Sequence, residues 1–120
     1  MVIKAAVSHR DAYNPIARAS FNVDSAGLCT SNLRRLPYRK LARRLPLVMI
    51  SHAGYPQTQG GEEPASISRF WTTEVLVEKI GFQGLIVSDD MEMGGILTQT
   101  SLPDAVVRAV LAGTHLIEIC

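Results

Sequence analysis

Three short apolar runs stand out along the last two thirds of the chain, and none shows the clean polar–apolar alternation of a half-exposed strand. They are LPLVMISHA, GLIVSDD and THLIEIC, at residues 45–53, 84–90 and 114–120. Runs of Val, Ile and Leu of this length are typical of strands buried on both faces of a parallel sheet. The pattern therefore predicts three parallel strands.

Two helical patterns separate these runs, at residues 68–82 and 101–113. Ser68 and Ser101 are the expected N-caps, and a glycine ends each helix. The apolar faces are expected to pack inward; they consist of Phe70, Trp71, Leu76, Val77 and Ile80 in the first helix and Val106, Val107, Val110 and Leu111 in the second. With an earlier helical segment at 32–46, the order of elements indicates an α/β fold with a parallel sheet.

Polar residues follow the first two predicted strands, where parallel α/β folds carry their functional loops. Asp89 and Asp90 stand at the mouth of a buried strand, where an unpaired charge is costly. A turn or helix cap would explain them, and so would a catalytic carboxylate. His52 follows the preceding strand; a hydrogen-bonded structural histidine is the favoured interpretation, and a substrate-side or supporting residue is the alternative.

The composition is that of one globular domain of 120 residues, with 47% hydrophobic and 19% charged residues. The net charge of +1 gives no general attraction to nucleic acid or membrane, and no apolar run approaches the roughly 20 residues of a membrane helix. The N-terminus does not resemble a signal peptide, so we expect a cytoplasmic protein. Cys29 and Cys120 lack metal-ligand spacing, and free thiols are favoured over a disulfide. No metal or cofactor is expected.

A basic stretch offers a different function, that of a nucleic-acid or partner-binding module. It contains six basic residues, Arg34, Arg35, Arg39, Lys40, Arg43 and Arg44. Neither an aromatic stacking platform nor a general basic excess accompanies it. A solvated helix face is therefore the favoured interpretation.

The segment GFQGLIVSDDMEMGGI (81–96) closely resembles the nucleophile segment of glycoside hydrolase family 3, in its single-domain β-N-acetylhexosaminidase branch. The segments LPYRKLARRLP, LVMISHAGYP, PASIS and AVVRAVLAGTHLIEIC resemble further parts of the same domain, so the resemblance covers residues 33–120. It implies a (β/α)8 barrel, which takes about 250 residues. We therefore expect the last three βα units of a partial TIM barrel, with residues 1–32 as a poorly matched loop segment.

The resemblance also implies catalytic roles. Asp89 falls on the family's nucleophile, and His9, in the segment VSHRDAYNPIARAS, falls on the histidine of its acid/base dyad. The aspartate that orients this histidine in the family is replaced here by Val7, which cannot do so. Asp90 is expected to be a supporting carboxylate, and Met93 is expected to pack beneath the site.

The function implied is hydrolysis of terminal β-linked N-acetylglucosamine with retention, through a covalent glycosyl-aspartate. Carbohydrate is then the partner, with neither nucleic acid nor membrane. The chain alone is expected to be inactive because the first five strands of the barrel have no counterpart in it, and it is expected to self-associate through open strand edges. A non-catalytic barrel remnant is the alternative.

Overall fold

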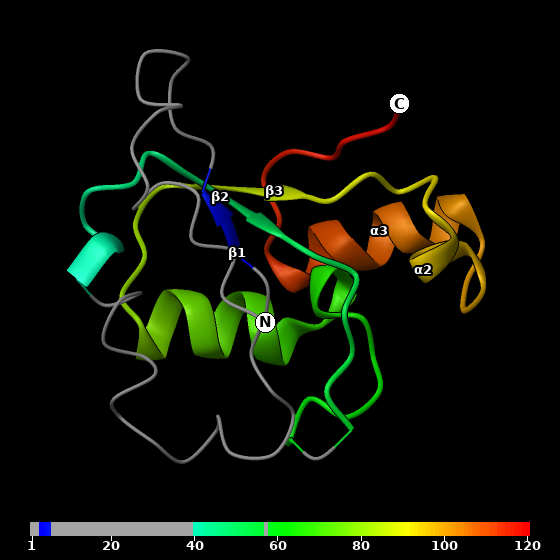
Figure 1. Cartoon of the computed structure of the whole chain (residues 1–120), viewed down its shortest axis with the longest axis horizontal. Helices are drawn as coiled ribbons and strands as arrows, with labels where there is room; N and C mark the ends of the chain where they lie inside the picture. The colour runs from blue at the N-terminus through cyan, green and yellow to red at the C-terminus, as the bar shows by residue number, and fades with distance from the viewer. Residues whose placement is uncertain (1–2, 6–39, 57) are drawn as a thin grey trace.

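The computed structural model describes residues 3–5, 40–56 and 58–120. Along the chain the elements are β1 (Ile3–Ala5), β2 (Leu47–Ile50), η1 (Ala65–Ile67), η2 (Phe70–Lys79), β3 (Leu85–Ser88), α2 (Gly94–Leu97) and α3 (Leu102–Ala112). In the view of Figure 1, helix η2 lies below the strands, and α3 lies to the right of β1 and β2, below the segment that follows β3. The arrangement is an α/β layer structure, as the order of apolar runs and helical patterns predicts.

Strands β2 and β3 pair in parallel, with Leu47 opposite Leu85 and Ile50 opposite Ser88. This confirms the parallel strands predicted from the first two apolar runs. The connection between them contains η1 and η2, so the segment from β2 to β3 is a βαβ unit. Its strands end level with one another, which brings the two following loops to the same edge of the sheet.

Residues 114–120 lie beside β3 in the parallel direction, but the described part of this run forms a single bridge, between Val87 and Leu116. The Leu116 N–H donates to the Ile86 carbonyl (3.0 Å), and the Ser88 N–H donates to the Leu116 carbonyl (2.9 Å). Beyond Ser88 the chain leaves the sheet, so the ladder ends. The position and direction of the third run are as predicted, whereas the prediction of a third full strand is wrong.

Strand β1 is an addition that the apolar pattern does not predict. It pairs antiparallel with β2, with Ile3 opposite Ile50 and Ala5 opposite Val48. The sheet order is therefore β1-β2-β3, and β2 is its central strand. A three-residue strand is too short to produce a recognisable period in the sequence.

The first predicted helix forms and begins where its N-cap signal indicates. Ser68 is buried and has an extended backbone, Arg69 is already helical, and the Ser68 carbonyl accepts from the Thr72 N–H (3.0 Å). The helix is wound as a π-helix, and the Ile80 N–H donates to the Val75 carbonyl (2.9 Å). Its end is as predicted, with a left-handed glycine followed by Phe82, which folds back into the core.

The second predicted helix, α3, is capped as its sequence indicates. The Ser101 hydroxyl accepts from the Asp104 N–H (3.4 Å) and donates to the Asp104 carboxylate (2.6 Å). Pro103 lies in the first turn, and Gly113 ends the helix in the left-handed conformation. The prediction that this valine-rich face packs inward is wrong, however, because Val107, Val110 and Leu111 are exposed. The residues that α3 buries are Ala105, Ala109 and Ala112.

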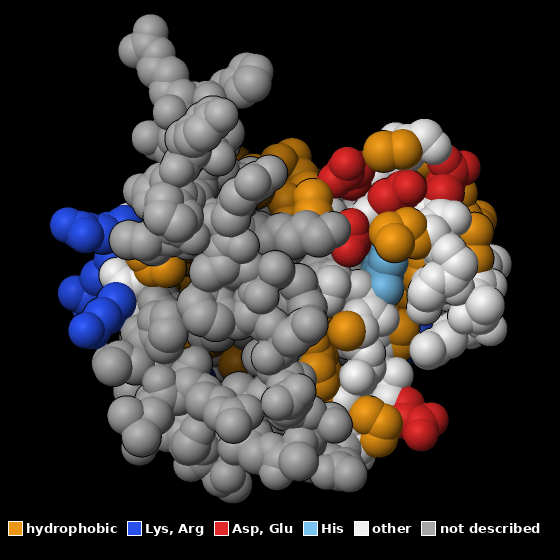
Figure 2. Space-filling view, viewed as in Figure 1, with side chains coloured by type: hydrophobic (Ala, Val, Ile, Leu, Met, Phe, Trp, Pro, Cys, Tyr) orange, Lys and Arg blue, Asp and Glu red, His pale blue; other side chains and the backbone are white. Residues whose placement is uncertain are grey.

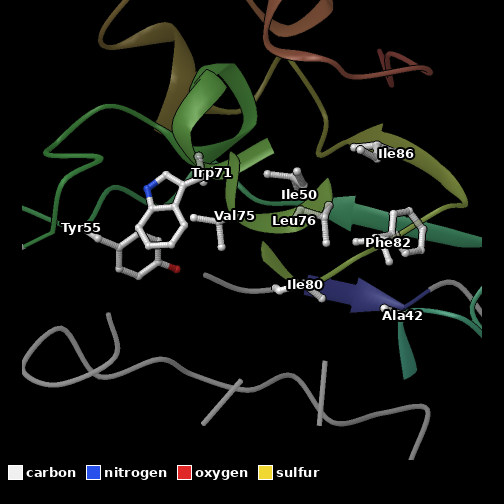
Figure 3. Close-up of a cluster of buried hydrophobic side chains, with 11 residues drawn as sticks. Ala42, Ile50, Tyr55, Trp71, Val75, Leu76, Ile80, Phe82 and Ile86 are labelled. Carbon is white, nitrogen blue, oxygen red and sulfur yellow. The ribbon is translucent and has the colours of Figure 1, made fainter. Parts of the chain in front are cut away.

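The described core consists of two clusters. The larger lies between the sheet and η2, and Figure 3 shows its side chains, including Trp71 edge-on to Tyr55 with ring centroids 5.2 Å apart. Its buried members are Ala42, Val48, Ile50, Tyr55, Ala65, Trp71, Val75, Leu76, Ile80, Phe82 and Ile86. The smaller cluster joins η1, α2 and α3 and consists of Ile67, Met91, Ile96, Ala105 and Ala109.

Candidate functional site

The loops that follow β2 and β3 meet at the carboxyl edge of the sheet. The Asp89 N–H donates to the carbonyl of Ile50, the last residue of β2 (2.9 Å), so the bond crosses from one strand end to the other. Figure 2 shows a histidine among acidic side chains on this part of the surface. The polar residues that the sequence singles out after the two strands therefore lie together.

Asp89 is placed rigidly at this edge. Its side chain is buried, with 9% of the residue exposed, and its Oδ1 accepts from the Asp90 N–H (3.3 Å). The residue before it, Ser88, is fully buried and its hydroxyl accepts from the Glu118 N–H (3.0 Å). The backbone that carries Asp89 is thus held by β2 on one side and by the run 114–120 on the other, which favours a fixed carboxylate direction.

Asp90 forms a turn. Its Oδ1 accepts from the Glu92 N–H (2.9 Å), and its carbonyl accepts from the Met93 N–H (3.1 Å). This is the backbone-mimicking turn that aspartate side chains form. The Asp90 side chain therefore stabilises the turn, whereas Asp89 provides the carboxylate at the strand end.

The methionine beneath the turn is Met91, which is fully buried against Ile67 and Ile96. Met93 has 45% of its surface exposed, so the prediction that Met93 packs beneath the site is wrong. The sequence resemblance singled out Met93 because the family motif has methionine there. Burial is decided by the direction in which the turn sends each side chain, and the motif does not encode that direction.

His52 connects three segments of the chain. Its Nε2 lies 2.7 Å from the Asp90 carbonyl oxygen, and its Nδ1 lies 2.7 Å from the Ser66 Oγ. A carbonyl only accepts, so Nε2 carries a proton, and in the neutral form of the ring Nδ1 accepts from the Ser66 hydroxyl. Sequence reasoning did not find Ser66, because its only signal is membership of the PASIS segment, 14 residues from His52 along the chain.

His9 and Val7 lie outside the described residues, so the acid/base histidine and the loss of its partner stay predictions from sequence. Of the basic stretch, the structure describes Lys40, Arg43 and Arg44, and all three are exposed. Exposure of these side chains agrees with the favoured interpretation of a solvated face.

In the part of the chain that the structure describes, no cluster of three or more His, Cys, Asp or Glu side chains could hold a metal ion. Cys120 is a free, exposed thiol. Desolvation, together with the Asp90, Glu118 and Glu92 carboxylates, raises the pKa of this thiol. Within the same described ranges, every helix is too short or too polar to cross a membrane.

Parallel strands joined through helices, with a buried carboxylate at a strand end, define part of an α/β domain with a site at the carboxyl edge of its sheet. Residues 9–120 match the Glycosyl hydrolase family 3 N terminal domain, and the chain belongs to that family. The sequence resemblance is thereby confirmed.

Among sequence relatives, the beta-hexosaminidase of Tolumonas auensis is 38% identical over 87 residues, which are 71% of this chain and 25% of that protein. The beta-hexosaminidase of Idiomarina loihiensis is 33% identical over 84 residues, 70% of this chain and 25% of that protein. The chain thus spans about a quarter of the length of these curated relatives.

Solved structures of similar proteins also match this chain over 70% of its length. CbsA from Thermotoga neapolitana superposes with a TM-score of 0.64 at 38% identity, over 70% of this chain and 19% of that one. The beta-N-acetylglucosaminidase from Thermotoga maritima gives a TM-score of 0.63 at 37% identity, over 70% and 19%. The arrangement of β2, β3 and their helices is therefore that of part of a family 3 barrel domain.

Proposed function

We propose that this chain carries the nucleophile of a retaining β-N-acetylhexosaminidase, and that Asp89 is that nucleophile. The observation that carries the proposal is the position of Asp89: a buried carboxylate at the end of β3, with its backbone bonded to the end of β2. A carboxylate that attacks a sugar needs a fixed direction, and these bonds supply it.

In this mechanism the Asp89 carboxylate attacks the anomeric carbon, the bond to the leaving oxygen breaks, and a glycosyl-aspartate forms. An acid protonates the leaving oxygen and then takes a proton from the water that hydrolyses the intermediate. Two displacements at one carbon retain its configuration. The family resemblance assigns the acid/base role to His9, which lacks its usual carboxylate partner at Val7.

The substrate we propose is a terminal β-linked N-acetylglucosamine. The names of the relatives support it, since they are beta-hexosaminidases and a beta-N-acetylglucosaminidase. We expect the 120-residue chain alone to show no measurable turnover, because it spans about a quarter of those relatives and a nucleophile without an oriented substrate contributes little.

The test restores a whole barrel. Residues 33–120 replace the matching segment of the Tolumonas auensis beta-hexosaminidase, and hydrolysis of 4-nitrophenyl N-acetyl-β-D-glucosaminide is measured. We expect turnover with the β-anomer as first product in the NMR spectrum. Asp89→Asn should lower kcat by about 10⁴-fold or more, as loss of a nucleophile does.

The matched control is Asp90→Asn, because the side-chain oxygen of asparagine still accepts from the Glu92 N–H. We expect this variant to stay within about tenfold of the parent, since its change leaves the turn intact. An active Asp89→Asn chimaera would overturn the assignment of the nucleophile. A folded but inactive parent chimaera would favour the alternative of a non-catalytic remnant.

A further inference from the structure

We infer that His52 is a positioning residue, which holds the Asp89–Asp90 turn from the end of the neighbouring strand and does not bind the sugar. The inference rests on the proposed role of Asp89. It assigns to one histidine the task of fixing the peptide group between Asp90 and Met91, one residue beyond the nucleophile, with Ser66 fixing the histidine in turn.

The geometry of the ring carries the inference. The His52 Nε2 donates to the Asp90 carbonyl over 2.7 Å, across 38 residues of sequence, and the Ser66 hydroxyl lies 2.7 Å from Nδ1. Ser66 itself is fully buried in η1. The ring is therefore anchored in the core at one nitrogen and reaches the turn with the other.

The same geometry excludes the competing role. A neutral imidazole has one donor and one acceptor, and both are used by protein groups here. A sugar hydroxyl could bond to the ring only after one of these short bonds had broken. His52 is thus placed to support the turn and is not available to a substrate.

The bond from His52 acts on Asp89 through a single residue. The Asp90 carbonyl that accepts from His52 belongs to the residue whose N–H donates to the Asp89 Oδ1. On either side, backbone bonds fix the Asp89 N–H to Ile50 and the Met91 N–H to Glu118. Between the Asp89 and Met91 amides, the described contact that holds the backbone from the neighbouring strand end is the bond from the His52 side chain to the Asp90 carbonyl.

The first experiment uses the full chain and needs no activity. Long-range proton–nitrogen NMR of the imidazoles should show His52 as the Nε2–H tautomer at neutral pH, because the Asp90 carbonyl requires a donor. In His52→Ala, the amide signals of Asp89, Asp90 and Met91 should shift and exchange faster. An Nδ1–H tautomer, or unchanged turn amides in a folded His52→Ala chain, would overturn the inference.

The second experiment uses the chimaera described above and separates positioning from substrate binding. We expect His52→Ala to lower kcat by about 10- to 100-fold, as misplacement of a reacting group does, with KM changed less than about threefold. His52→Gln should recover part of kcat, because its amide can donate to the same carbonyl. The control is His115→Gln, since the exposed His115 contacts the amide of Ile86, at the other end of β3.

Different results would overturn the proposed nucleophile, Asp89, and the proposed positioning role of His52. If Asp89→Asn leaves the chimaera active, the proposed nucleophile is wrong, and the NMR experiment still decides whether His52 holds the turn. If Asp89→Asn abolishes turnover while His52→Ala raises KM at constant kcat, the nucleophile stands and the positioning role is overturned. Equal loss in His52→Ala and His52→Gln would also overturn it.

Discussion

Helices η2 and α3 end in the same way but bury side chains of different size. Each ends at a glycine in the left-handed conformation. Helix η2 buries large residues, among them Trp71 and Leu76, whereas α3 buries alanines and exposes Val107, Val110 and Leu111. An apolar stripe on a helix is therefore an insufficient guide to the face that packs.

The difference follows from what each helix packs against. The large residues of η2 reach the side chains of β2 and β3, such as Ile50 and Ile86, and together they fill the space between helix and sheet. Helix α3 packs Ala105 and Ala109 against Ile67, Met91 and Ile96 of neighbouring short segments. Methyl groups suffice there because the large partners already occupy the space.

The largest expected effect tests this comparison with one substitution made in both helices. Leu76→Ala, at 1% exposure, should lower the free energy of unfolding by about 2–5 kcal/mol, the usual cost of such a cavity. Leu111→Ala, at 70% exposure, should stay within about 0.5 kcal/mol of the parent. Urea unfolding of the full chain measures both, and the fluorescence of the single tryptophan, Trp71, reports the transition.

Similar losses in the two variants would contradict the burial of η2 and α3 described here. A far-ultraviolet circular dichroism spectrum is the control for each variant, because it shows whether the helices persist before unfolding begins.

A smaller effect is expected when the alanine face of α3 is enlarged. Ala109→Leu adds a side chain to a fully buried position and should cost about 1–3 kcal/mol through overpacking. Val110→Leu makes a similar chemical change one residue away on the exposed face, where we expect a change of less than about 0.5 kcal/mol. If Val110→Leu were the more costly of the two, the valine face would be the packed one, as the sequence pattern predicts.

Local signals in the sequence predicted the parts of the fold that neighbouring residues decide. The cap formed by Ser101 and the stops at Gly81 and Gly113 depend on a few adjacent residues, and all three form. The packed face of α3 depends on segments far away in sequence. Both its alanine face and its valine face have a helical period, so the pattern alone could not choose between them.

The candidate site shows the same limit. The sequence placed Asp89 and His52 after parallel strands, and the structure brings their loops together. It could not show that the His52 ring is held by Ser66 and by the Asp90 carbonyl, because those contacts span 14 and 38 residues. The role of Asp89 as nucleophile and that of His9 as acid/base stay predictions.

The smallest difference we expect concerns the two glycines that end these helices. Gly81 has φ of 82° and Gly113 has φ of 106°, so an alanine at either position is strained by about 1–2 kcal/mol. A Cβ on Gly81 meets no atom within 4 Å, whereas one on Gly113 would lie 2.8 Å from the Thr73 Oγ1. That hydroxyl donates to the Ala112 carbonyl over 2.7 Å and so joins η2 to the end of α3.

Gly113→Ala should therefore destabilise the chain more than Gly81→Ala, by about the 0.5–1.5 kcal/mol of one hydrogen bond. Thr73→Ala removes the hydroxyl and supplies the control, since in that background the two glycine variants should cost nearly the same. Urea unfolding of the six chains measures the difference as a double-mutant cycle. If the excess cost of Gly113→Ala persists without the hydroxyl, it comes from backbone strain at the end of α3, and the link from Thr73 to Ala112 does not distinguish the two helix ends.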